Sequence, residues 1–417
     1  MKHIPLLLLT LLLLGSCQEQ QPDLRIPDEL YGDWVPVGYQ IIIDSLSIKG
    51  GYSDIDLGLG IPEVGFTFMT NGLVDTKAGF YKYTAPNETG KRRALYIGSE
   101  SVFHVQNDTL RIFNPTDSTW ILRTIYKLNR DTLSFFHTEE IVCTFIKKNF
   151  NLETAPKFDK IIVSTSGCYG SCPISSTMIE SNGQVTFYGE RYTSKLGTYH
   201  GKISRARYLE LQKKFQKADL SNIGTHFSDG VTDNEELTVT FIRGDSIYKT
   251  ITDYAHSGPL ELRWALHEAR NLYQTVQLKP IAKGNKLFST SISFLYFSQG
   301  ENKLRLSQSE GYLLWDYLRK GTITEKEFQS RFKLGFYKNN LWVPSGEETN
   351  QWVPFGEEPI LQKDDANNVK EISTDGRYFK FVRQHKPPVT IDVGFNFFER
   401  NFSIKVLKPD PKEEPLY

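Results

Sequence analysis

Short runs in which apolar and polar residues alternate fill residues 30–150 and predict β-strands. The runs lie at 64–69, 79–83, 101–105, 109–113, 120–128 and 132–136. Asn-Gly, Asn-Asp and Asn-Arg-Asp segments, which favour turns, follow several of them. Strands of this length between such turns predict an all-β domain, folded as an antiparallel barrel or sandwich.

Three segments of this region are similar to those of lipocalin-like domains. These are Tyr31-Gly32-Asp33-Trp34, Asp108-Thr109-Leu110 and Asp131-Thr132-Leu133. The resemblance implies a barrel that can enclose a small apolar ligand. His104 and His137 lie in predicted strands and, if they face the interior, are candidate ligand contacts. The alternative is that both are ordinary strand residues.

Residues 156–276 predict an α+β domain in which strands come before and between two helices. Ile203–Ala218 has helical spacing of apolar residues, with Ser204 as the N-cap. Residues 237–242 and 247–251 predict a hairpin, and Gly258-Pro259 predicts the start of a helix over Leu260–Tyr273.

Residues 281–407 predict a further α+β domain. We expect strands at 292–297, 372–382 and 389–393 and helices at 307–319 and 324–332, the second with a Thr324/Glu327 capping box. A ten-residue repeat at 341–360 contains Trp342 and Trp352, which could contact a sugar or protein partner or simply pack. Residues 408–417, rich in proline and charge, predict a disordered tail.

The N-terminal residues 1–16 predict a signal peptide, since Lys2 precedes an apolar run, Ile4–Leu14, too short to span a bilayer. Leu14-Gly15-Ser16-Cys17 resembles the lipobox of bacterial lipoproteins. That resemblance implies cleavage before Cys17, its acylation, and attachment to the membrane. Residues 17–29 would be the lipidated Cys and its tether, and Gln18 favours the outer membrane. The alternative is an ordinary signal peptide with a coincidental cysteine.

Composition excludes several broad classes of protein. The chain has 417 residues, with 49 Lys plus Arg balanced by 49 Asp plus Glu. A zero net charge argues against a general nucleic-acid binder, and four Cys are too few for a disulfide-built scaffold.

Cys168 and Cys172 form the most distinctive pair of candidate functional residues. In an oxidising compartment a disulfide is the default for this C-x₃-C spacing. A redox pair and a metal site stay open as alternatives, although a metal would need two further ligands. Cys143, within an apolar run, is expected to be a buried free thiol.

The segment around this pair, Gly167-Cys168-Tyr169-Gly170-Ser171-Cys172-Pro173, resembles the uncharacterised bacterial domain family DUF6438. Matching residues occur elsewhere in 156–276, including Thr232-Asp233, Asp253-Tyr254 and Gly258-Pro259. The family has no established activity, so the resemblance implies a boundary and a fold class but no reaction.

No convincing catalytic motif, cofactor motif or metal motif stands out in the sequence. Asp253 and His256, with Asp233 nearby, could form a base and its orienting group, but no G-x-S-x-G serine accompanies them. We therefore expect a non-catalytic, lipid-anchored envelope protein that binds a small apolar ligand or an envelope protein. The alternatives are a thiol–disulfide redox protein using Cys168 and Cys172, and a hydrolase with a dispersed site.

Overall fold

A computed structural model describes residues 26–43, 46–50, 65–85, 92–281, 295–336 and 369–409, with the backbone alone at 41–43, 46–50 and 336. The chain divides into two compact units. The first comprises residues up to Phe80 together with Ser99–Asn149, and the second comprises Tyr81–Gly98 and Phe150 onward. Within the described residues, no helix is long and apolar enough to cross a membrane.

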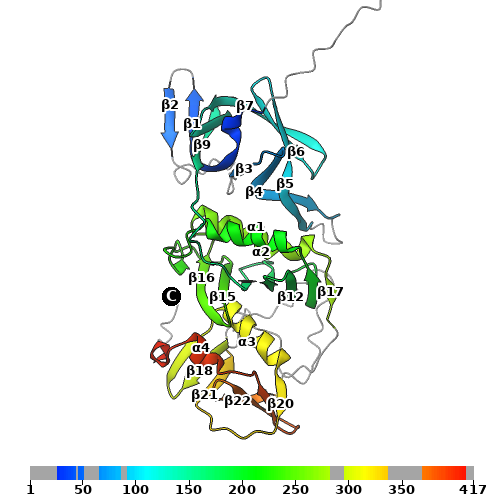
Figure 1. Cartoon of the computed structure of the whole chain (residues 1–417), viewed down its shortest axis with the longest axis vertical. Helices are drawn as coiled ribbons and strands as arrows, with labels where there is room; N and C mark the ends of the chain where they lie inside the picture. Colours follow the sequence, from blue (N-terminus) through cyan, green and yellow to red (C-terminus); the bar gives the residue numbers. More distant parts are fainter. Residues whose placement is uncertain are drawn as a thin grey trace, which may run out of the picture. The chain divides into compact units, whose positions relative to one another are not determined.

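An eight-stranded antiparallel barrel occupies the N-terminal region (Figure 1). After the 3-10 helix η1 (Asp28–Leu30), its strands are β1 (Gly32–Ile43), β3 (Phe66–Phe68), β4 (Leu73–Tyr83), β5 (Ala94–Gln106), β6 (Thr109–Asn114), β7 (Thr119–Leu128), β8 (Thr132–Phe136) and β9 (Ile141–Lys148). They pair in the order β1-β3-β4-β5-β6-β7-β8-β9, and β9 closes the ring on β1; β2 (Leu46–Gly50) pairs with β1 outside the ring. The predicted all-β domain is therefore confirmed as a barrel.

The barrel core consists largely of aromatic side chains. Because neighbouring residues of a strand point to opposite faces, alternate residues of each strand reach this core. The rings of Phe66 and Phe145 lie 5.4 Å apart between centroids, and those of Phe68 and Phe103 lie 4.8 Å apart. At one end the Trp34 indole N–H donates to the Leu30 carbonyl over 2.7 Å. Ring-on-ring packing of this kind stabilises the barrel interior, and the binding of a small apolar ligand there stays a prediction.

The second unit contains an eight-stranded sheet with the order β14-β16-β15-β10-β11-β12-β13-β17. Its strands are β10 (Lys160–Thr165), β11 (Ile174–Glu180), β12 (Gln184–Arg191), β13 (Gly197–Lys202), β14 (His226–Phe227), β15 (Glu236–Arg243), β16 (Ser246–Tyr254) and β17 (Lys279–Pro280). Its helices are α1 (Arg205–Gln216) and α2 (Leu260–Thr275). Both helices and the β15–β16 hairpin confirm the predicted elements. The Ser204 hydroxyl accepts the Arg207 N–H at the start of α1, as expected of an N-cap.

Helices cover both faces of this sheet, so its central strands are apolar on both sides. Ile161 and Val163 of β10 pack in the core that α1 and α2 share. Ile162, which points to the opposite face, packs in a second core with residues of α3 (Gln308–Lys320). Figure 1 shows α1 and α2 together on one side of the sheet and α3 on the other. Burial on both sides explains why the β10 segment shows no alternation of apolar and polar residues.

Hydroxyl groups fix the N-terminal end of α3 on the sheet. The Ser309 N–H donates to the Thr238 hydroxyl over 3.1 Å, and the Ser309 and Thr240 hydroxyls lie 2.8 Å apart. The Thr250 hydroxyl donates to Glu310 over 2.7 Å, while Ser307 and Glu310 form a capping box. Since each buried hydroxyl has a partner here, the polar contacts select one docking position for α3.

The C-terminal sheet has the order β20-β24-β23-β22-β21-β18-β19-β25. Its strands are β18 (Leu295–Gln299), β19 (Asn302–Arg305), β20 (Thr322–Thr324), β21 (Phe332–Phe336), β22 (Val369–Thr374), β23 (Tyr378–Arg383), β24 (Val389–Asp392) and β25 (Lys408–Pro409). The helix α4 (Phe397–Asn401) and the 3-10 helix η3 (Ile404–Val406) follow β24. Its core residues belong to the same cluster as Ile162, so this sheet and the central sheet share one core through α3. The domain boundary near 276–281 stays a prediction.

Three expectations for this region are corrected by the structure. Residues 324–332 are not a helix, because Thr324 belongs to β20 and its hydroxyl accepts the Lys326 N–H, a local bond that competes with helix formation. Residues 372–382 are not one strand, because a turn at Gly376 divides them between β22 and β23. Lys408 and Pro409, placed in the predicted disordered tail, pair with β19.

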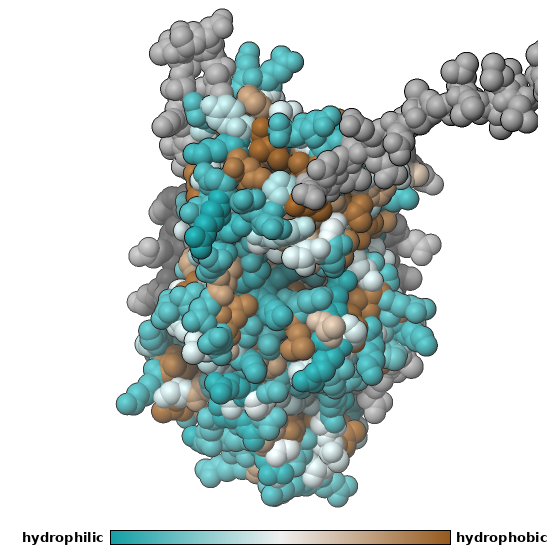
Figure 2. Space-filling model, turned by 45° about the horizontal axis from the view of Figure 1, so that its top comes forward, coloured by the Kyte–Doolittle hydropathy of each residue, from teal (hydrophilic) through white to brown (hydrophobic). Residues whose placement is uncertain are grey.

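The surface is largely polar, as Figure 2 shows in teal, with brown apolar residues gathered on the barrel. The predicted signal peptide, Cys17, Trp342, Trp352 and the 341–360 repeat lie outside the described residues.

Candidate functional site

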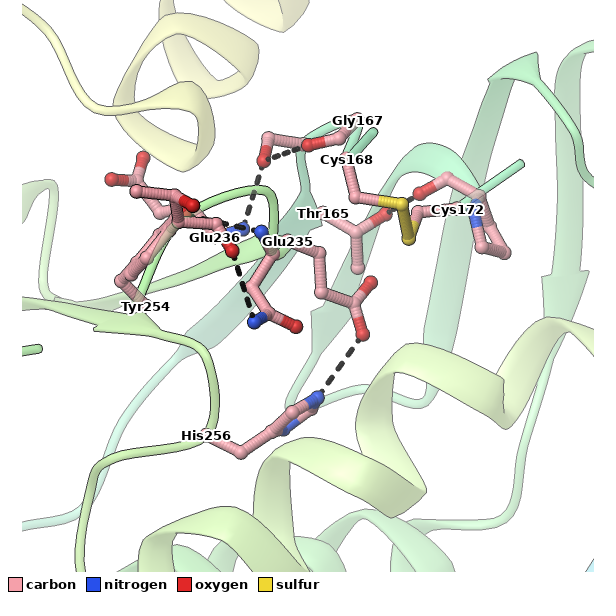
Figure 3. The surroundings of a disulfide bond; sticks show 12 residues. Thr165, Gly167, Cys168, Cys172, Glu235, Glu236, Tyr254 and His256 are labelled. Carbon is pink, nitrogen blue, oxygen red and sulfur yellow. Dashed lines mark hydrogen bonds and ion pairs between the residues drawn. A yellow bond between two sulfur atoms is a disulfide. The ribbon is translucent and has the colours of Figure 1, made fainter. Parts of the chain in front are cut away.

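The connection between β10 and β11 is a loop closed by the predicted disulfide. Cys168 and Cys172 are bonded, with their Cα atoms 5.5 Å apart, and both are half-buried. The Thr165 hydroxyl donates to the Pro173 carbonyl over 2.6 Å, which joins the two strand ends below the disulfide. Tyr169, inside the closed loop, is 83% exposed. Covalent and hydrogen-bonded closure thus hold the exposed Tyr169 on a short, restricted segment. Figure 3 shows the disulfide with Thr165 beside it.

A second loop, before β15, runs beside the disulfide loop. The Tyr169 N–H donates to the Asp233 carbonyl over 3.2 Å. The Glu236 N–H donates to the Ser166 hydroxyl over 2.8 Å, and the Ser166 N–H donates to the Glu236 carbonyl over 2.9 Å. Asp233 has a φ of +66°, a left-handed conformation that Asp tolerates better than most residues. These bonds extend the β10–β15 pairing into the loops and restrict them together.

The turn between β16 and α2 supports the second loop. The Tyr254 hydroxyl accepts the Asn234 N–H over 3.1 Å. Asp253 is fully buried and accepts the Gly258 N–H over 2.9 Å just before α2. Burial raises the pKa of Asp253, although the bonds from the Gly258 and Ser257 N–H groups oppose the rise. A Cβ at Gly258 would lie 3.2 Å from the Asp253 carboxylate, which favours glycine there. Asp253 therefore shapes the start of α2, a structural task, and is not paired with His256.

Glu235 is the buried charge at the centre of this region. Only 7% of the residue is exposed, and its carboxylate pairs with His256 Nε2 over 3.2 Å and with the Arg270 guanidinium of α2. Burial by itself would raise the pKa of Glu235, but hydrogen bonds and charges from His256 and Arg270 outweigh it and hold the pKa below its ordinary value. Figure 3 shows Glu235 between His256 and the disulfide. An ionised, paired carboxylate thus ties the second loop to α2.

Sequence reasoning did not identify the pairing of Glu235 with Arg270. A signal was present, because Leu237, Val239 and Phe241 of β15 pack against the α1–α2 core. Glu235 has the same strand parity, which places it on the α2 side of the sheet. In the sequence, Glu235 lies within the acidic run Asp233-Asn234-Glu235-Glu236. A run of this composition predicts a solvated loop throughout, so it does not show that Glu235 is buried and its neighbours are not.

The histidines proposed as ligand contacts lie outside this site. His104 does not face the barrel interior: its neighbours Phe103 and Val105 are in the core, and its own ring lies 4.6 Å from that of the partly exposed Trp120. His137 directly follows β8, and its pKa is lowered by burial and by Arg123. A ligand role for either residue stays a prediction. Cys143 is buried and forms no disulfide with another described cysteine, as expected.

The arrangement combines a buried set of charged groups with an exposed disulfide loop. Glu235 pairs with His256 and Arg270, and Asp253 accepts the Gly258 N–H. The described residues contain no group of three His, Cys, Asp or Glu side chains placed to hold a metal. Tyr169 and residues 229–234 of the second loop reach solvent. The chemical options are therefore recognition by the loop or exchange at its half-buried disulfide.

Comparison with known proteins adds a domain family but no activity. No curated protein matches the chain. A solved structure of an uncharacterised protein from Bacteroides eggerthii DSM 20697 is similar, with 12% identity over 28% of this chain and 98% of that chain. Its TM-score is 0.17, so it carries no argument here. Residues 159–273 match the model of DUF6438, a domain of unknown function. The sheet, the two helices and the disulfide loop described above thus form a DUF6438 domain within this chain.

Proposed function

We propose that this chain is a lipid-anchored protein of the bacterial cell envelope that binds a protein partner through the disulfide loop of its DUF6438 domain. The observation that carries the binding role is the exposure of Tyr169, 83%, on a loop whose ends are joined by a disulfide. Aromatic anchors dominate many interfaces, and a loop already ordered loses little entropy on binding. Tyrosine suits this task because its ring offers a large contact area with few rotatable bonds.

Three segments far apart in the sequence support this loop together. Asp233 accepts from the Tyr169 backbone, Tyr254 accepts from Asn234, and Glu235 joins the same loop to α2 through Arg270. Several contacts from distant segments that hold one surface loop in place are typical of binding sites on a rigid scaffold.

The thiol–disulfide alternative is favoured by one observation, the partial exposure of both cysteines. Reactive thiolates need a helix N-terminus or a neighbouring cation to lower the thiol pKa. The pair instead lies between two strands, and the nearby Glu235 is an acid whose charge is already matched by Arg270. The geometry therefore favours a structural disulfide that shapes the loop.

Site-specific photocrosslinking in living cells tests the binding role. A benzophenone amino acid at position 169 is expected to give a discrete adduct. The same amino acid in place of Tyr248, which is 38% exposed on β16 of the same domain, is the matched control and is expected to give none. Absence of an adduct at 169, or the same adducts at both positions, would contradict recognition by the loop.

Metabolic labelling tests the membrane anchor separately. A clickable palmitate analogue should label the wild-type chain and fail to label Cys17→Ser. A wild-type chain that takes up no label would show that Cys17 is not an acylation site, whatever the outcome of the crosslinking.

A further inference from the structure

The outer face of the barrel carries a group of exposed apolar side chains. Along β7, Ile121 packs against the core, whereas Trp120 and Leu122 point outward and are 41% and 50% exposed. On β5, Phe103 is in the core and Val102 is 45% exposed. Neighbouring residues of these strands point to opposite faces, so the residues next to the core residues place large apolar side chains in solvent.

These side chains form one continuous surface across β5, β6 and β7. Phe113 of β6 is opposite Trp120 in register, with ring centroids 5.5 Å apart, and the His104 ring of β5 lies 4.6 Å from that of Trp120. Arg111 is opposite His104 on β5 and opposite Leu122 on β7. We call this surface the Trp120 patch; it comprises Val102, His104, Arg111, Phe113, Trp120 and Leu122. Figure 2 shows brown apolar residues among the teal polar residues of the surface.

The chemistry of the patch matches the interface of a bilayer. A tryptophan beside aliphatic side chains is the composition that proteins use at the level of the lipid headgroups. An arginine within the same surface complements anionic headgroups. Val102 and Leu122, on either side of the aromatic rings, could enter the boundary between headgroups and acyl chains.

The chain length between the proposed anchor and the barrel favours a bilayer over other partners. Eight residues lie between Cys17 and Ile26, so the two are nine residue steps apart, and Ile26 packs against the barrel core. A fully extended chain of nine residues spans at most about 32 Å. An acylated Cys17 would therefore hold the barrel at the membrane at a high effective concentration, which adds to the affinity that the patch itself has for the bilayer. We propose that the Trp120 patch docks the barrel on the surface of the lipid bilayer; this rests on the lipid anchor of the proposed function.

The test uses the full chain from Gln18 without its lipid, so that the measured binding to vesicles comes from the protein surface and not from the acyl chains. Co-sedimentation with vesicles of equal parts phosphatidylglycerol and phosphatidylethanolamine should give measurable binding. In Trp120→Ser/Leu122→Ser, the partition coefficient should fall by about tenfold or more, because two half-exposed apolar side chains no longer enter the interface.

The matched control is Val37→Ser/Ile146→Ser, which removes two apolar residues of similar exposure, 47% and 44%, from β1 and β9. It should bind vesicles as wild type does. The proposal is overturned if wild type does not bind, if both double variants lose binding equally, or if the patch variant instead converts a dimer to a monomer. A chain that takes up no palmitate at Cys17 would remove the anchor, whereas failure of sedimentation alone would remove only the docking surface.

Discussion

Removing Arg270 should weaken the DUF6438 domain by isolating the charge on Glu235. The side chain of Glu235 is 8% exposed and that of Arg270 is 18% exposed, so Arg270→Met leaves a buried carboxylate with His256 as its remaining ion-pair partner among the described residues. Breaking a buried ion pair from one side costs about 3–5 kcal/mol. Since Arg270 retains some solvent and His256 remains, we expect a loss of about 2–3 kcal/mol in this domain.

The assay is native-state hydrogen exchange followed by mass spectrometry of peptides from β15 and α2. It reports the free energy of opening for these elements without requiring the two compact units to unfold together. The control is Glu235→Gln/Arg270→Met, which removes the stranded charge and should recover most of the lost protection. Equal loss in the single and the double variant would refute the idea that the isolated carboxylate is the cause.

The pH dependence provides a second check on the same residue. The pKa of Glu235 is held below its ordinary value of 4.5, so its ionised form stabilises the fold above that pH, and this contribution is lost as the pH falls through the lowered pKa. In Arg270→Met the pKa of Glu235 should rise. As the pH falls, the carboxylate of the variant is therefore protonated before that of wild type, and its protonation removes the buried charge that destabilises the variant. The gap in protection between wild type and Arg270→Met should therefore shrink from pH 7 to pH 4.5. A gap that does not change with pH would contradict the electrostatic explanation.

Three further changes test separate contacts. Replacing Cys168 and Cys172 with Ser opens a loop of sequence separation four, and loop entropy predicts a loss of about 2 kcal/mol in urea unfolding; no change would mean that the hydrogen bonds alone order the loop. Ser309→Ala removes a buried hydroxyl that contacts Thr240 and should cost about 1–2 kcal/mol of protection in α3, whereas unchanged exchange there would refute the docking role of this contact. Ser204→Ala should lower the stability of α1 by about 1 kcal/mol in the same measurement, and Ser204→Gly by only a few tenths; a similar loss in both variants would argue against N-capping.

The elements predicted correctly are those whose signals are local. The start of α2 depends on Gly258-Pro259 and on Asp253 five residues earlier, and the start of α1 on the hydroxyl of Ser204. The barrel strands follow from alternation over single runs, because one face of each strand meets a core and the other does not. A few neighbouring residues of the sequence are therefore enough to predict each of these elements.

The elements predicted wrongly depend on partners far along the chain. Thr324 and Glu327 have the spacing of a capping box, but Thr324 pairs with Thr390 in the sheet, and the Ser330 hydroxyl donates to the Phe332 carbonyl. His104 is a candidate ligand contact only if it faces the interior, and the parity of a strand alone does not show which face is buried. The core positions of Phe103 and Val105 settle that question.

The candidate site was only partly visible in the sequence. The disulfide follows from spacing and compartment, but the approach of Tyr169 to Asp233, and of Glu235 to Arg270, requires β10 and β15 to pair and α2 to cover them. No local pattern encodes that convergence. Three segments that carry the resemblance to DUF6438, Gly167–Pro173, Thr232-Asp233 and Asp253-Tyr254, meet at one end of the sheet, which is a property of the fold and not of any single segment.

The most direct test of the account is the reduction potential of the Cys168–Cys172 disulfide in the folded chain that begins at Gln18. A disulfide that shapes a recognition loop should resist the glutathione pool, with a potential below about −300 mV. A potential near −200 mV or higher, together with a thiolate that reacts at neutral pH, would contradict the recognition loop and support thiol–disulfide exchange.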